Sequence, residues 1–113
     1  MYKKDSQVLV GYLVDYMCGK NMAMSDVKKS DAKAARHTRE CALDEACASN
    51  GYGLVTGGKF YKFDTTGNVK ANQFLRTTKK ENNILVQVAG KINKEIFFVT
   101  SIKDAMVSQR KGK

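Results

Sequence analysis

The chain has three cysteines and one histidine, the residue types best suited to bind a transition metal. Cys18 follows an apolar segment, and the other three lie within the segment HTRECALDEAC. Thiolate sulfur and imidazole nitrogen are the usual ligands of tetrahedral zinc, and thiolate also suits Cu(I). No Cys-x-x-Cys pair is present, so the spacing matches no standard zinc motif. The residue types nevertheless predict a zinc or copper site formed by Cys18, His37, Cys41 and Cys47.

A single helix running through this segment would separate the four ligands. His37 and Cys41 are four residues apart and would share a helix face. Cys47 would point roughly 120° away from Cys41 and would lie on the apolar side. A four-ligand site therefore requires the helix to break, and Thr38 is one position where a break is expected.

The alternative is that the cysteines are structural or inert. Cys18 is expected at the end of a buried strand and Cys47 on the apolar helix face, so a disulfide would join these two. Such a bond closes a long loop and would stabilise the fold by about 3–4 kcal/mol in the chain-entropy account. Cys41 would then be the thiol nearest to water and to His37. A Cys/His pair also needs an orienting group and an oxyanion donor to catalyse, so an enzyme is not predicted.

The elements that must position these residues are mostly strands. Residues 7–16 (QVLVGYLVDY) are rich in β-branched and aromatic residues, and Gly11 indicates a bulge or bend. Gly57 and Gly58 suit a tight hairpin turn. The segment from 19 to 36 is expected to be a loop leading into a helix, with Ser30 or Thr38 as N-cap. The expected elements are strands at 7–16, 53–56, 59–64, 84–88 and 95–102, a helix ending near Ser49, a turn at 65–68, and a short helix at 69–78.

This order predicts a mainly β (α+β) fold, a five-stranded OB-like barrel. A helical insertion at about 19–51 separates strands 1 and 2, and a helix separates strands 3 and 4. An α+β sandwich is the alternative. The 113 residues fit a single domain, 1–113, with a basic tail at about 103–113. No apolar run is long enough to predict a membrane-spanning helix.

Positive charge is concentrated in the second half of the chain. The formal net charge is +9, and residues 57–113 hold 12 Lys and Arg against 4 Asp and Glu. This bias favours an anionic partner. Lysines beside strand aromatics resemble the stacking platforms of single-strand-binding OB-folds. The alternative function is therefore nucleic-acid or other polyanion binding with purely structural cysteines, through Lys59, Lys62, Lys91 and Lys94.

The ordered motifs resemble a family of small exported bacterial OB-like β-barrel proteins of uncharacterised function. The resemblance rests on VGYLVDYMCG, on HTRECALDEACASNGYGLVTGGKFYKFDTTGNVKANQFL, and on later strands ending in VAG and VTSI. It covers roughly residues 8–102. It implies a periplasmic or secreted barrel whose signal peptide is absent from this sequence, with Cys18, His37, Cys41 and Cys47 as the matching positions. A cytoplasmic location is the alternative.

These observations together predict a non-enzymatic, exported binding domain. Its expected ligand is zinc or copper, held by the Cys/His cluster. In the alternative, the domain binds nucleic acid or another polyanion.

Overall fold

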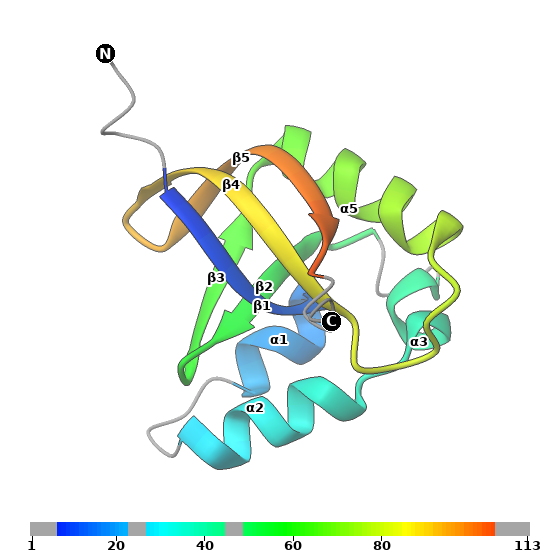
Figure 1. The fold of residues 1–113 in the computed structure, drawn as a ribbon. Helices are drawn as coiled ribbons and strands as arrows, with labels where there is room; N and C mark the ends of the chain where they lie inside the picture. The colour runs from blue at the N-terminus through cyan, green and yellow to red at the C-terminus, as the bar shows by residue number, and fades with distance from the viewer. Residues whose placement is uncertain (1–6, 23–26, 45–48, 106–113) are drawn as a thin grey trace, which may run out of the picture.

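The computed structural model describes residues 7–22, 27–44 and 49–105, and it is mainly β (Figure 1). The strands are β1 (Gln7–Asp15), β2 (Tyr52–Thr56), β3 (Lys59–Phe63), β4 (Leu85–Asn93) and β5 (Ile96–Asp104). The helices are α1 (Tyr16–Met22), α2 (Val27–Arg36), α3 (Arg39–Leu43) and α5 (Thr65–Thr77). Helices thus lie between β1 and β2 and between β3 and β4, as predicted.

The five strands form a mixed sheet that closes into a ring in the order β1-β2-β3-β5-β4. Strand β1 pairs with β4 through residues 7–12 and with β2 through residues 12–15. Strand β1 therefore has two neighbours along its length, β4 and β2. Strand β3 is parallel to β5, and the other four pairings are antiparallel.

Alternating apolar residues of the strands fill the interior of the ring. The largest buried side chains include those of Tyr52, Phe63, Phe97, Leu13 and Leu54. Removing such side chains from water supplies most of the driving force for folding, about 1.5–3 kcal/mol for each one that is fully buried.

Helix α5 begins earlier than predicted. Residues 65–68 were expected to form a turn, but Asp64 is the N-cap and the helix starts at Thr65. The Oδ1 atom of Asp64 accepts hydrogen bonds from the amides of Gly67 (3.1 Å) and Val99 (2.9 Å). A carboxylate that satisfies a helix N-terminus stabilises it, and the second bond ties this end of α5 to β5.

The insertion differs from the prediction in two places. The first strand ends at Asp15, so Cys18 belongs to α1 and not to the strand, and residues 19–22 are helical where a loop was expected. Helix α2 begins at Val27, so the predicted N-cap at Ser30 is wrong, although the helix predicted after Ser30 is present as far as Arg36. The predicted helix towards Ser49 ends instead at Leu43, with residues 45–48 outside the described residues. The predicted break at Thr38 is confirmed, because Thr38 caps α3 and accepts a hydrogen bond from the Cys41 amide (3.1 Å).

The predicted hairpin turn between β2 and β3 is also confirmed. Gly57 and Gly58 have φ angles of 57° and 81°, and Thr56 pairs with Lys59 across the turn. Both angles lie in the left-handed region that glycine adopts without steric cost.

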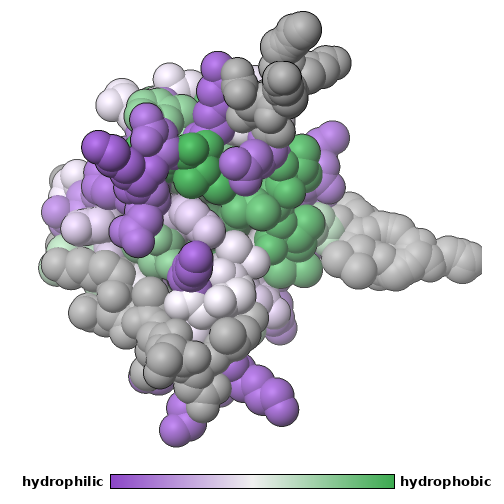
Figure 2. Space-filling model, turned by 90° about the vertical axis from the view of Figure 1, so that its left-hand side faces the viewer, coloured by the Kyte–Doolittle hydropathy of each residue, from purple (hydrophilic) through white to green (hydrophobic). Residues whose placement is uncertain are grey.

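Apolar side chains are also present on the outer surface. Figure 2 shows apolar surface below the grey residues at the top of the view, beside hydrophilic side chains. The large apolar side chains that are exposed include Val8 and Val10 of β1 and Phe98 of β5. Among the described residues, no helix is long and apolar enough to cross a membrane. Strand β5 extends to Asp104, and the rest of the predicted basic tail from residue 106 lies outside the described residues.

Candidate metal centre

A buried carboxylate and a buried imidazole lie in direct contact where β1 ends. Asp15 is completely buried, and only 8% of His37 is exposed. His37 Nε2 lies 2.6 Å from Asp15 Oδ1, although the two residues are 22 positions apart in the chain. A carboxylate in the interior requires such a partner, since an unpaired buried charge is costly.

The second oxygen of the same carboxylate holds α1. Asp15 Oδ2 accepts a hydrogen bond from the Cys18 amide at 3.0 Å, in the manner of a helix N-cap. Burial would raise the pKa of Asp15, but the hydrogen bonds from His37 and Cys18 and the charge of His37 outweigh it. The pKa of Asp15 is therefore held below its ordinary value. The carboxylate is ionised at neutral pH and is fixed at both oxygens.

Two thiols complete the cluster. Cys18 lies in the first turn of α1 and is partly exposed, and Cys41 lies in α3 at the surface. One ligand atom from each of Asp15, Cys18, His37 and Cys41 lies within 4.8 Å of the others. Oxygen, nitrogen and two sulfur atoms at such separations form a donor set that suits zinc.

The break between α2 and α3 brings these residues together. Helix α2 contacts α1 and β1. It ends at Arg36, and the His37 side chain enters the interior where the chain turns into α3. Two backbone hydrogen bonds tie this break to the loop before β4, from Asn83 N to Ala35 O (2.7 Å) and from Arg39 N to Glu81 O (2.8 Å). The imidazole is therefore held by the backbone on both sides.

A buried tyrosine fixes α3 against the sheet. The Tyr52 hydroxyl donates to the carbonyl of Ala42 at 3.0 Å and accepts from Asn72 Nδ2 at 2.9 Å. Ala42 is completely buried and directly follows Cys41. The position of the Cys41 backbone thus depends on β2 and α5 as well as on its own short helix.

Of the four predicted ligands, the structure brings three together. Cys18, His37 and Cys41 are in the cluster, and Cys41 is near water and His37 as predicted. Cys47, the fourth predicted ligand, lies outside the described residues. The predicted Cys18–Cys47 disulfide therefore also falls outside what the structure describes. In the described part of the chain no disulfide is formed. Asp15 was not predicted as a site residue. It directly follows a run of buried strand positions, and this could have indicated it, because a buried carboxylate needs a partner inside the protein.

The other imidazole nitrogen, Nδ1, is available as a metal ligand. His37 Nδ1 is buried and has no hydrogen-bond partner among the described residues. When Nε2–H donates to the ionised Asp15, Nδ1 carries the lone pair and can bind a metal. Histidines that bind metals usually donate their second ring N–H to a carboxylate or carbonyl in this way.

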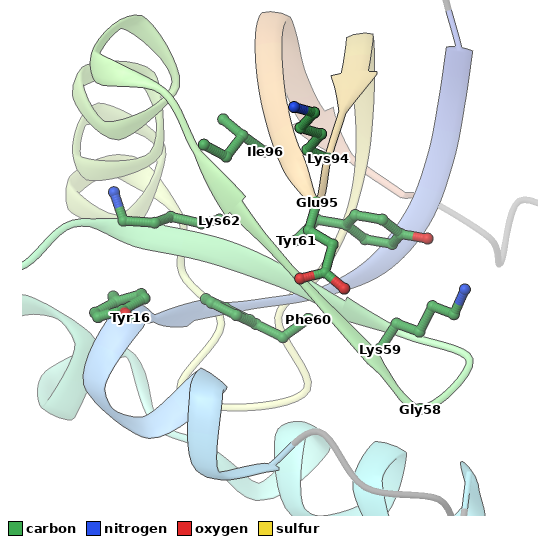
Figure 3. Close-up of a pocket in the computed structure, with 9 residues that line it drawn as sticks. All are labelled: Tyr16, Gly58, Lys59, Phe60, Tyr61, Lys62, Lys94, Glu95 and Ile96. Carbon is green, nitrogen blue, oxygen red and sulfur yellow. The ribbon is translucent and has the colours of Figure 1, made fainter.

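Three of the four lysines predicted to bind anions also lie together. Lys59, Lys62 and Lys94 line one groove (Figure 3). None of the four residues of the Asp15 cluster is among those that line it. Lys91 is exposed on β4 and is not among the residues that line it. The structure thus groups three of the four lysines, and anion binding by them stays a prediction.

Comparison of the chain with protein-family models, with curated proteins and with solved structures gave no match.

Proposed function

We propose that this protein is a non-enzymatic, exported zinc-binding domain with an OB-like barrel fold. The observation that carries the zinc proposal is the cluster of Asp15, Cys18, His37 and Cys41 within 4.8 Å. The ring of strands and the order of elements support the barrel. The resemblance to exported bacterial proteins supports export.

Cys18, Cys41 and His37 Nδ1 are the proposed ligands, and Asp15 orients the imidazole. This assignment preserves the 2.6 Å contact between Asp15 and His37 Nε2 and uses the buried nitrogen that lacks a hydrogen-bond partner among the described residues. Two thiolates and a neutral imidazole also match the borderline-soft character of Zn²⁺. Cu(I) is the main competitor for the same thiolates.

The fourth ligand remains the predicted Cys47. Structural zinc sites are four-coordinate and closed, whereas catalytic sites keep one position for water. A fourth protein ligand therefore belongs with the non-enzymatic proposal. If Cys47→Ser lowers zinc affinity as much as Cys41→Ser, the site is closed by protein.

Metal analysis and thiol titration of the untagged protein test the proposal. We expect one zinc per chain, thiols that react slowly until a chelator is added, and proton release when zinc is restored. Cys18→Ser and Cys41→Ser should each lose the metal, whereas Ser30→Ala, which removes a buried hydroxyl of α2, should keep it. A wild-type protein with three freely reacting thiols and no metal would contradict the proposal. Copper at the same stoichiometry would correct the metal but retain the site.

A further inference from the structure

A groove lies between β3 and the turn that joins β4 to β5 (Figure 3). Its cavity volume is about 480 Å³, within the range of small-ligand sites. Three aromatic and three basic side chains contribute to its lining: Tyr16, Phe60, Tyr61, Lys59, Lys62 and Lys94.

The groove exists because β3 and β5 pair over a short length. Their parallel pairing involves Lys62 with Ile96 and Phe63 with Phe97. The preceding β3 residues, 59–61, pair with β2 on the other side, and the ring opens beside them. Backbone and side chains of β3 therefore face solvent at this edge.

Strand alternation divides the groove into two parts, each with an aromatic ring and a lysine. In Figure 3, Phe60 and Lys62 extend toward Tyr16, whereas Tyr61 and Lys59 extend toward the opposite side. The Tyr16 and Phe60 ring centroids are 5.9 Å apart, and Lys62 Nζ lies 5.5 Å from the Tyr16 centroid. We call these residues the Phe60 part of the groove.

The opposite side, the Tyr61 part, is also held by packing. Tyr61 contacts Phe97 edge to face, with a centroid distance of 6.4 Å. Phe97 is completely buried, so it fixes the inner edge of the tyrosine ring while Tyr61 itself stays partly exposed. A ring held in this way needs little ordering when a flat ligand stacks on it.

The turn above the groove is a two-residue hairpin loop. Lys94 and Glu95 have φ angles of 51° and 71°, and Asn93 pairs with Ile96 across the turn. Positive φ at both residues is the favoured geometry of such a loop, because it matches the twist of the two strands. The turn places a lysine and a carboxylate on the groove, so both charges face any bound ligand.

We propose that this groove binds single-stranded nucleic acid, with one base in the Phe60 part, the next in the Tyr61 part, and phosphates beside the lysines. Stacking on aromatic rings combined with lysine contacts to the backbone is the general way in which proteins hold single strands. The three lysines outnumber the single carboxylate of Glu95, and the net charge of +9 favours the same partner. Two stacking parts in one groove favour linked nucleotides over a free mononucleotide. None of the residues that line the groove is a proposed metal ligand.

Fluorescence anisotropy with a labelled oligothymidylate of about 15 nucleotides at low salt tests this proposal. Lys59→Gln and Lys94→Gln should each weaken binding and reduce the slope of log affinity against log salt by about 0.7. Glu95→Gln should tighten binding, because it removes a negative charge beside the phosphates. All three side chains are exposed, so these variants should fold. Lys33→Gln, at an exposed lysine of α2, is the control for loss of one charge.

Stacking is tested separately. Tyr61→Leu should weaken oligonucleotide binding by about 5- to 150-fold. If this variant unfolds, the lysine and glutamate variants alone decide the question. Absence of binding at low salt, or equal losses from Lys33→Gln and Lys59→Gln, would overturn the proposal. Equal affinity for thymidine monophosphate and the oligonucleotide would also overturn it. So would heparin binding as tight as oligonucleotide binding in both the wild type and a folded Tyr61→Leu variant. Zinc content should be unchanged in every variant.

Discussion

The Asp15 carboxylate contacts two other members of the cluster, the His37 imidazole and the Cys18 amide. Asp15→Asn should weaken zinc binding by about 10- to 100-fold, the range for partners that orient a ligating histidine. The neutral amide loses the charge that favours Nε2–H, while its volume is nearly unchanged. Competition with a chelator of known affinity measures the change. Asp104→Asn, which removes a carboxylate from a partly exposed pair with Lys80, is the control and should bind zinc normally.

A loss for Asp15→Asn as complete as that for Cys18→Ser would contradict the orienting role, because it would make Asp15 a direct ligand. No change in affinity would remove Asp15 from the site altogether.

The lowered pKa of Asp15 makes the metal-free protein sensitive to acid. The folded state binds the Asp15 proton less readily than the unfolded state does, so the contribution of Asp15 to stability is present above the unfolded pKa. That contribution is lost as the pH falls below about 4 and through the folded pKa. Urea unfolding in the presence of a chelator at several acidic pH values measures this loss. Asp15→Asn should flatten the dependence, and a slope identical to wild type would show that the Asp15 pKa is the same in both states.

Residue types were enough to predict three members of the cluster but not the fourth. Cys18, His37 and Cys41 were selected because thiols and imidazoles bind metals. Asp15, an acidic residue within the first predicted strand, was not among the predicted ligands. Its role depends on a contact with His37 across 22 positions, and that contact is fixed by how α2 packs against β1. Spacing along the chain carries no information about such packing.

At the scale of elements, α3 is short and depends on Tyr52 for its position. Tyr52→Phe removes the hydroxyl that bonds the Ala42 carbonyl and Asn72, and leaves a buried carbonyl without that donor. We expect a loss of about 1–3 kcal/mol in the free energy of unfolding. Zinc binding should also weaken, though by less than in Cys41→Ser, because the ligand itself remains.

Urea unfolding and chelator competition on the same preparation measure both effects of Tyr52→Phe. Tyr12→Phe, at a partly exposed tyrosine of β1, is the matched control. If Tyr52→Phe lowered stability without affecting zinc affinity, α3 would not depend on Tyr52 for the placement of Cys41.

Strands and turns were easier to predict than the helices of the insertion. Alternating β-branched and aromatic residues and the Gly57-Gly58 turn are local signals, and all five predicted strands occur. Their bounds agree within two residues except in β4, which continues to Asn93, five residues beyond its predicted end. The start of α5 was missed because Thr65, Thr66 and Gly67 have weak helix propensity, and the hydrogen bonds to Asp64 compensate for it. The helices between β1 and β2 are mostly polar, so their boundaries depend on caps and on long-range contacts.

At the scale of the whole molecule, metal binding should be coupled to stability. The ligands come from α1, α3 and the break between α2 and α3, so an unfolded chain cannot hold them together. Zinc should therefore raise the unfolding free energy by about 2.7 kcal/mol when free zinc is 100-fold above its dissociation constant. Calorimetry at several buffered zinc concentrations measures this, with His37→Ala as the variant that should not respond. An unfolding temperature independent of zinc in the wild type would contradict the coupling.

The order of elements was predictable for the whole chain, but the closure of the ring was less so. Alternation showed which segments are strands, whereas the parallel pairing of β3 with β5 arises only from the three-dimensional path of the chain. That short pairing also creates the groove beside Tyr61. Charge therefore predicted which lysines bind anions, whereas the position of three of them in one groove is known only from the structure.

X-ray absorption at the zinc edge of the purified protein tests the proposed ligands. We expect zinc with at least two sulfur neighbours at about 2.3 Å and an imidazole nitrogen at about 2.0–2.1 Å. Cys41→Ser should remove one sulfur or the metal. A first shell of oxygen and nitrogen alone, or sulfur neighbours that persist unchanged in both Cys18→Ser and Cys41→Ser, would contradict this assignment.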